Sequence, residues 1–79
     1  MRLDKFLKVS RLIKRRSVAN EACDSARVVV NGRDAKASYQ VKVGDVIEIA
    51  YGNRLLRVEV INVTENVKKA DAAAMYREL

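Results

Sequence analysis

The sequence predicts an α+β fold, because the spacing of its apolar residues changes from helical to strand-like along the chain. As far as residue 26, apolar side chains recur at intervals of three and four, as they do on one face of a helix. After that point, short β-branched runs are separated by turn dipeptides, which is typical of a small, mostly antiparallel sheet. Seventy-nine residues have room for one such domain with a small core.

Two helices are predicted at the start of the chain. Leu3, Phe6 and Leu7 form the apolar stripe of the first helix, and a turn is expected at residues 10–13. The second helix is expected to begin at residues 14–16 and to run to about Ser25. Its apolar face is made of mostly small side chains, which would let it lie close to its neighbour: Val18, Ala19, Ala22, Cys23 and Ala26.

The rest of the chain predicts four or five short strands and a last helix. Strands are expected at residues 27–31, 35–36, 46–51 and 55–63, with turns at residues 31–32, 43–45 and 51–54. The alanine-rich residues 67–79 favour a third helix. Residues 1–64 are therefore expected to form one domain with an extended sheet, and residues 65–79 a C-terminal helix that packs on it or trails it.

The excess positive charge of the chain lies in its first sixteen residues. That segment has seven basic side chains and one acidic one, whereas residues 17–79 have nine of each and sum to zero. Such an asymmetry predicts a surface that binds and orients a phosphate-bearing polyanion. The predicted RNA-binding residues are the seven cations: Arg2, Lys5, Lys8, Arg11, Lys14, Arg15 and Arg16. A weaker contact is expected from Asn31, Lys36 and Ser38.

The basic residues 14–16 would lie in the first turn of the second helix. There the helix macrodipole disfavours cations by about 0.3–1 kcal/mol. A bound phosphate would supply the missing counter-charge, because free backbone N–H groups could bind it together with Arg15 and Arg16. The charge pattern therefore predicts a phosphate site at the start of this helix.

Composition argues against several other classes of protein. One cysteine and no histidine leave neither an internal disulfide nor a zinc-ligand set of the usual kind, so no cofactor is expected. No apolar run approaches the roughly 18 residues of a membrane span, and we expect a cytoplasmic protein. Asp4 has no second carboxylate or base nearby, so it is expected to pair with Lys8 or to hold an arginine. Cys23 is expected to be a small core residue, and the sequence predicts a binding protein that is not an enzyme.

The scarcity of aromatic residues bears on how RNA would be bound. Tyr39 and Tyr51 lie apart in the sequence and do not predict a stacking platform for single strands. A pair of short basic helices suits recognition of the shape and backbone of a folded RNA, with low sequence specificity. An architectural DNA-binding protein is the alternative that the charge pattern leaves open.

Four segments in order, RLDKFL, KRRSVANEA, RVVVNGRDAK and VKVGDVIEI, resemble the S4 RNA-binding domain over about residues 1–50. The resemblance implies an S4-like (αL) fold with two N-terminal helices packed on a small sheet, and it matches Arg16 to the family's RNA-contacting arginine. The RLDK start, residues 35–38 and the AAAMY segment look like the short stand-alone bacterial members, which are proteins of ribosome-associated quality control and their heat-shock protein 15 relatives. The lack of a long basic extension favours the first group.

For the quality-control members, the resemblance implies binding to an obstructed large (50S) ribosomal subunit. The RNA partners would be 23S rRNA and P-site peptidyl-tRNA, and a separate protein factor would take part in alanine tailing of the stalled chain. The protein would be a monomer off the ribosome. Two alternatives remain open: a heat-shock protein 15-like recycling factor, and the RNA-targeting module of an RNA-modifying system.

Two residues depart from the family pattern. Ala26 stands where the family usually has glycine before the first strand, and alanine would cost about 1 kcal/mol relative to glycine if that position needs a positive φ. Arg15 stands where the family often has serine or threonine, so a helix cap is lost and a charge is gained. The fold is expected to survive both changes.

Overall fold

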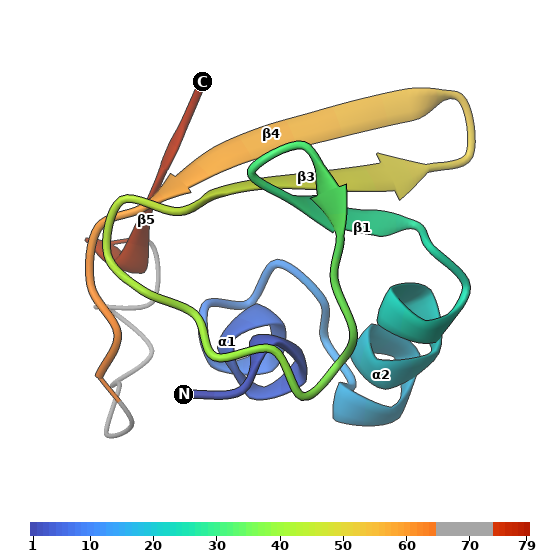
Figure 1. Cartoon of the computed structure of the whole chain (residues 1–79), viewed down its shortest axis with the longest axis horizontal. Helices are drawn as coiled ribbons and strands as arrows, with labels where there is room; N and C mark the ends of the chain where they lie inside the picture. Colours follow the sequence, from blue (N-terminus) through green and yellow to red (C-terminus); the bar gives the residue numbers. More distant parts are fainter. Residues whose placement is uncertain (65–73) are drawn as a thin grey trace.

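Two helices lie on one side of an antiparallel sheet in the computed structural model, which describes residues 1–64 and 74–79 (Figure 1). The helices are α1 (Leu3–Val9) and α2 (Arg16–Asp24). The strands are β1 (Val28–Val30), β2 (Arg33–Asp34), β3 (Val46–Tyr51), β4 (Arg54–Val60) and β5 (Tyr76–Glu78), in the spatial order β2-β1-β3-β4-β5. The predicted α+β class is confirmed.

The core lies between the helices and the facing side of the sheet. The apolar stripe of α1 is fully buried, as predicted, and β3 and β4 contribute alternate residues because successive strand side chains point to opposite faces. Core residues of these elements are Leu3, Phe6, Leu7, Ala19, Ala22, Cys23, Ile47, Ile49, Val58 and Val60. The expectation was wrong for Val18, which is 47% exposed on α2, and for Ala26, which lies exposed beyond the end of that helix.

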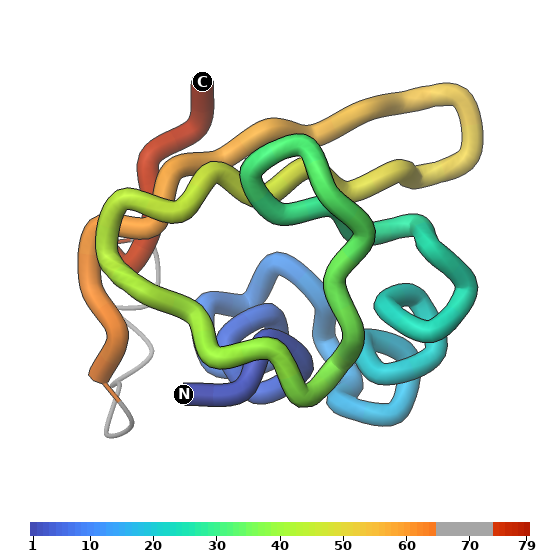
Figure 2. The backbone as a smooth tube through the Cα atoms, viewed as in Figure 1, coloured from blue at the N-terminus to red at the C-terminus, as the bar shows by residue number. Residues whose placement is uncertain are grey.

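The long connection between β2 and β3 wraps around the N-terminus of the chain (Figure 2). Leu3 N donates a hydrogen bond to the Tyr39 carbonyl at 2.8 Å. Val41 N donates to the Met1 carbonyl at 2.9 Å. Arg2 lies between these two bonds, so the backbone that carries it is fixed on both sides.

The β1–β2 turn takes the conformation that its sequence predicts. Asn31 and Gly32 have φ values of 53° and 79°, so the turn occupies two residues. Val30 then pairs directly with Arg33, and the strand expected at residues 35–36 lies instead at Arg33–Asp34. The chain leaves the sheet before residue 35 because Ala35 is buried in the core.

The C-terminal end is a strand where the sequence predicted a helix. Residues 67–73 of that helix lie outside the described residues. Beyond them Tyr76–Glu78 forms β5, in which Tyr76 pairs with Val60 and Arg77 with Glu59. The helical prediction is wrong here, because Met75 is buried in the core and the chain then covers the edge of β4. Pairing with β4 thus places residues 76–78 in a strand, although the sequence favoured a helix there.

Candidate RNA-binding surface

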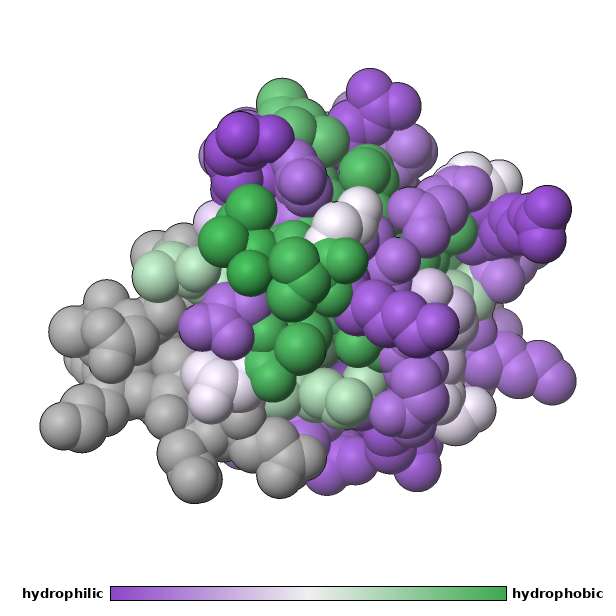
Figure 3. All heavy atoms as spheres, turned by 60° about the vertical axis from the view of Figure 1, so that its left-hand side comes forward, coloured by the Kyte–Doolittle hydropathy of each residue, from purple (hydrophilic) through white to green (hydrophobic). Residues whose placement is uncertain are grey.

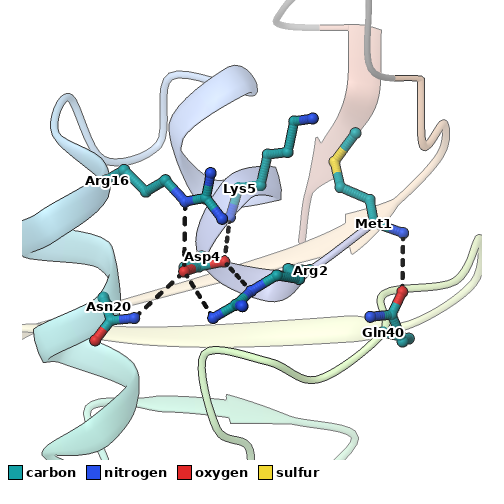
Figure 4. A network of polar contacts seen from close by, with 7 residues as sticks. All are labelled: Met1, Arg2, Asp4, Lys5, Arg16, Asn20 and Gln40. Atoms are coloured by element: carbon teal, nitrogen blue, oxygen red, sulfur yellow. Dashed lines mark hydrogen bonds and ion pairs between the residues drawn. The ribbon is translucent and has the colours of Figure 1, made fainter.

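Asp4 is the centre of a polar network that joins the N-terminus to both helices (Figure 4). It lies in the first turn of α1 and is 2% exposed. Its carboxylate accepts hydrogen bonds from Arg2 Nε at 3.2 Å and Nη2 at 3.3 Å, and from Arg16 Nε at 3.5 Å. The Lys5 backbone N–H and the Asn20 side-chain amide donate at 2.8 and 3.3 Å. Of the two roles expected for Asp4, the structure shows the one in which it holds arginines.

The network favours an ionised Asp4 while both arginines remain accessible. Burial alone would raise the pKa of Asp4, but hydrogen bonds from Asn20, the Lys5 amide and Arg2, together with the charge of Arg16, lower it below the ordinary 3.8. The side chains of Arg2 and Arg16 are 46% and 48% exposed. Two guanidinium groups therefore share one carboxylate and still present N–H donors and a net positive charge to solvent.

Three other predicted cations lie together at the end of α1 and in the loop after it. Lys8, Arg11 and Lys14, with Val9, line an open concavity of about 530 Å³. Arg11 has a φ of 63°, a left-handed conformation that residues with a side chain adopt only at a cost. The concavity is thus lined by three positive charges, the chemistry that attracts a phosphate group.

Arg15 and Arg16 mark the start of α2, close to where the sequence predicted it. Arg15 is the N-cap residue with an extended backbone, and its side chain makes no capping hydrogen bond. The first turn contains no acidic residue, so the positive end of the helix carries positive charge. Asp4 supplies part of the counter-charge that was expected from a phosphate, since it binds Arg16 from the neighbouring helix. The remaining predicted cation, Lys5, is half-buried on α1.

The three weaker candidates lie on the β1–β2 turn and on the connection that follows it. Lys36 and Ser38 are exposed, next to the segment that fixes Arg2. The Asn31 side chain is engaged within the protein, because Nδ2 donates to Asp45 at 3.0 Å and Oδ1 accepts from Val46 N at 2.9 Å. Asn31 could therefore contact RNA only through its backbone atoms.

Asp45 anchors the connection that wraps around Arg2. It is 8% exposed, and besides Asn31 it accepts hydrogen bonds from the Tyr39 hydroxyl and from Lys42 N, both at 2.9 Å. Burial would raise the pKa of Asp45, but these bonds lower it below the ordinary value. The same bond to Asp45 raises the pKa of Tyr39. The Tyr39 hydroxyl thus stabilises this connection by its hydrogen bond to Asp45.

Asn20 and Asp45 belong to this arrangement although the sequence did not single them out. Asn20 follows Arg16 by four residues on α2, and that spacing places both side chains on one helical face. This spacing was the available signal. Asp45 is the last residue of the turn predicted at residues 43–45, and its distant partner Asn31 could not be identified from spacing.

The outer face of the sheet carries two ion pairs between neighbouring strands among the described residues. Arg57 Nη2 lies 3.2 Å from Glu48 Oε1 on the neighbouring strand, and Arg77 pairs with Glu59. These pairs join β4 to β3 and to β5. This part of the sheet is therefore locally neutral, in contrast to the surface formed by α1, α2 and their loop.

Apolar surface collects in the middle of the face that Figure 3 shows, with hydrophilic side chains around it. Among the described residues, Leu55 and Val43 are the most exposed large apolar side chains, at 65% and 62%. Neither belongs to α1, α2 or the loop between them. Because apolar groups cannot bind phosphate, these two side chains add nothing to the candidate phosphate-binding surface formed by the two helices, their loop and the N-terminus.

Metal ligands, the single thiol and the lengths of the helices can be described for the part of the chain that the structure describes. No group of three or more His, Cys, Asp or Glu side chains is placed there to bind a metal ion. Burial, with the nearby charges of Asp4 and Asp24, raises the pKa of the Cys23 thiol to about 11, so at neutral pH it is a protonated core group. Among the same residues, neither helix has the length and apolar character needed to cross a membrane.

Known proteins share both the sequence and the fold. The S4 domain family matches residues 1–47. The RQC P-site tRNA stabilizing factor of Streptococcus pneumoniae is 57% identical over 76 residues, which cover 96% of this chain and 86% of that protein. Its namesake from Bacillus subtilis is 53% identical, covering 96% and 88%. The trimeric structure of heat shock protein 15 from Vibrio cholerae has a TM-score of 0.91 at 30% identity, covering 100% of this chain and 81% of that one. The resemblance read from four sequence segments is thereby confirmed, and the chain belongs to the S4 domain family.

Proposed function

We propose that this chain is a non-enzymatic RNA-binding factor of ribosome-associated quality control. In this proposal it binds obstructed 50S subunits in the cytoplasm, where it contacts 23S rRNA and P-site peptidyl-tRNA. It thereby supports alanine tailing of the stalled chain, in which a separate protein factor takes part. The names of the relatives that cover nearly the whole chain support a role at P-site tRNA.

The observation that carries the proposal is the attachment of two half-exposed arginines to one buried carboxylate. Arg2 and Arg16 come from different elements, yet Asp4 orients both guanidinium groups before any ligand arrives. An oriented guanidinium loses less freedom when it binds a phosphate, and it can do so through two N–H groups at once. The network is therefore suited to rigid recognition of an RNA backbone.

The second group of cations extends this surface beyond the network. Lys8, Arg11 and Lys14 offer three more charges around their concavity. Contacts to phosphates position a protein on RNA without reading its sequence. The proposed mode is therefore recognition of folded RNA by shape and charge. At the start of α2, free backbone N–H groups would bind a phosphate together with Arg15 or Arg16.

Titration of a labelled, folded tRNA at several salt concentrations tests the RNA-binding part of the proposal. If about six phosphates are neutralised, log affinity should fall against log salt with a slope on the order of −4 to −6. A slope near zero would contradict the electrostatic mode. Equal binding to duplex DNA at one salt concentration would instead favour the architectural DNA-binding alternative.

Co-sedimentation with ribosomal subunits tests the proposed target. Tagged protein should recover 50S subunits that carry peptidyl-tRNA, and Arg16→Ala should reduce this recovery without unfolding the chain. Arg57→Ala is the matched control, because it removes the same charge from the outer face of the sheet, where Arg57 is paired with Glu48. Recovery of 30S subunits or mRNA would refute the proposed target, and full recovery by Arg16→Ala would refute the site.

A recycling factor like heat-shock protein 15 is the second candidate, favoured by the close match of the fold to that of the Vibrio cholerae protein. Both candidates bind 50S subunits, so binding does not separate them. The two candidates are separated by measuring alanine tails on stalled chains in cells with and without the gene. Loss of the tails supports the first candidate, and unchanged tails support the second.

A further inference from the structure

The loop between α1 and α2 is attached to the β3–β4 hairpin by one side chain. The Tyr51 hydroxyl donates a hydrogen bond to the Leu12 carbonyl at 2.8 Å, between residues 39 positions apart. Leu12 directly follows Arg11 and stands two residues before Lys14, and both cations line the concavity. We propose that Tyr51 is a positioning residue for RNA binding, which fixes this loop so that Arg11 and Lys14 are in place for phosphate. This inference rests on the proposed function.

Tyr51 is well placed to act as a fixed anchor. It is the last residue of β3 and pairs with Arg54 across a two-residue turn in which Gly52 has a φ of 54°. Strand β3 lies in the middle of the sheet, with β1 and β4 on its two sides. Burial, with Tyr76 nearby, raises the pKa of Tyr51, so its hydroxyl remains a donor at neutral pH. The anchor is therefore rigid and does not titrate near neutrality.

The loop itself is held in a costly conformation. Arg11 has a positive φ, which is unfavourable for a residue with a side chain. Two backbone bonds, Arg11 N to Lys8 O and Ile13 N to Leu7 O, both at 3.0 Å, attach the loop to the end of α1. The bond from Tyr51 to Leu12 attaches it to the sheet as well. Without that bond, the segment that carries Arg11 and Lys14 would be held by α1 but no longer by β3.

A direct contact between RNA and the Tyr51 ring is the competing explanation, because the residue is 40% exposed. Tyr51→Phe separates the two, since it keeps the ring for stacking and removes the hydroxyl that binds Leu12. Tyr76→Phe is the matched control, because it removes a hydroxyl from the nearby tyrosine, and among the described residues that hydroxyl makes no hydrogen bond to the loop.

The experiment is a mutant cycle in which tRNA affinity is measured for Tyr51→Phe in the wild-type and in the Arg11→Ala/Lys14→Ala background. Loss of one hydrogen bond predicts that Tyr51→Phe weakens affinity by about threefold to tenfold, whereas Tyr76→Phe leaves it unchanged. In the Arg11→Ala/Lys14→Ala background, Tyr51→Phe should have no further effect, because the side chains that it positions are gone. Amide hydrogen exchange in the free protein should be faster at Arg11 and Ile13 in Tyr51→Phe, with core amides unchanged.

Each other outcome overturns the inference in a distinguishable way. Unchanged affinity or unchanged loop exchange in Tyr51→Phe would show that the bond does not position the loop. An equal loss of affinity in both backgrounds would show that Tyr51 acts on RNA directly or on the whole fold. If the wild-type chain does not bind tRNA, the proposed function fails and this inference fails with it.

Discussion

The Asp4 carboxylate of α1 accepts a hydrogen bond from Nε of Arg16, the first residue of α2, at 3.5 Å. Asn20 on α2 adds a second link to the same carboxylate at 3.3 Å, and Arg2 binds it from the N-terminal side. One buried acidic residue therefore links the two helices and the N-terminus through side-chain hydrogen bonds. RNA affinity should accordingly depend on a negative charge, although RNA itself is negative.

Replacement of Asp4 by asparagine should weaken RNA binding although it makes the chain more positive. Asparagine has the same shape, but it lacks the charge that attracts Arg2 and Arg16, so the free energy of unfolding should fall by about 1–3 kcal/mol. Urea unfolding and tRNA titration measure the two effects. Asp24→Asn, an exposed control with the same change in charge, should bind RNA at least as well as the wild type. Tighter binding by Asp4→Asn would show that net charge alone governs affinity.

Acid should destabilise the fold through the same carboxylate and through Asp45. Both folded-state pKa values lie below the ordinary 3.8, so the ionised carboxylates stabilise the fold above that pH. This stabilisation is lost as the pH falls through the folded-state pKa. Urea unfolding between about pH 7 and about pH 3 should show a drop in stability that is smaller in Asp4→Asn and in Asp45→Asn. An equal drop in the wild type and both variants would assign the acid sensitivity to other groups.

Ala26 is a strained residue whose replacement by glycine should stabilise the protein. Its φ is 59°, and it follows α2 in a Schellman turn, in which Ala26 N donates to Cys23 O and Arg27 N to Ala22 O. Glycine adopts this conformation without the steric cost, so Ala26→Gly should raise the free energy of unfolding by about 1 kcal/mol. Thermal unfolding measures the gain. Ala50→Gly, at an exposed position in β3, should instead lower the free energy of unfolding, because glycine is unfavourable within a strand.

The sequence predicted those parts of the fold that depend on neighbouring residues. The helical spacing of Leu3, Phe6 and Leu7 and the Asn31-Gly32 turn are local features, and the structure confirms both. The family pattern also marked Ala26 as a position that would be strained if its φ were positive. The cluster of N-terminal cations is visible for the same reason, since charge can be counted along the chain, whereas their contact with RNA stays a prediction.

What the sequence could not predict depends on contacts between distant residues. Asp4 meets Arg16 and Asn20 twelve and sixteen positions away, so the spacing that places those two on one face of α2 does not reveal that both bind Asp4. The strand at Tyr76–Glu78 forms because β4 offers it an open edge, whereas the local alanines favour a helix. The bond from Tyr51 to the loop likewise requires the folded sheet.

Arg11→Gly should stabilise the free protein and weaken its binding to RNA, because Arg11 combines a left-handed backbone with a charge in the concavity. Glycine relieves strain of about 1 kcal/mol, while the loss of one phosphate contact should make the salt slope less negative by about 0.7–0.9. Arg11→Ala removes the charge but keeps the strain, so it should lose affinity without gaining stability. Ala26→Gly relieves strain outside the concavity and should keep full affinity. Thermal unfolding measures the stability of these three variants, and tRNA titration measures their affinity. Unchanged affinity in Arg11→Gly would mean that the strained residue has no role in RNA binding.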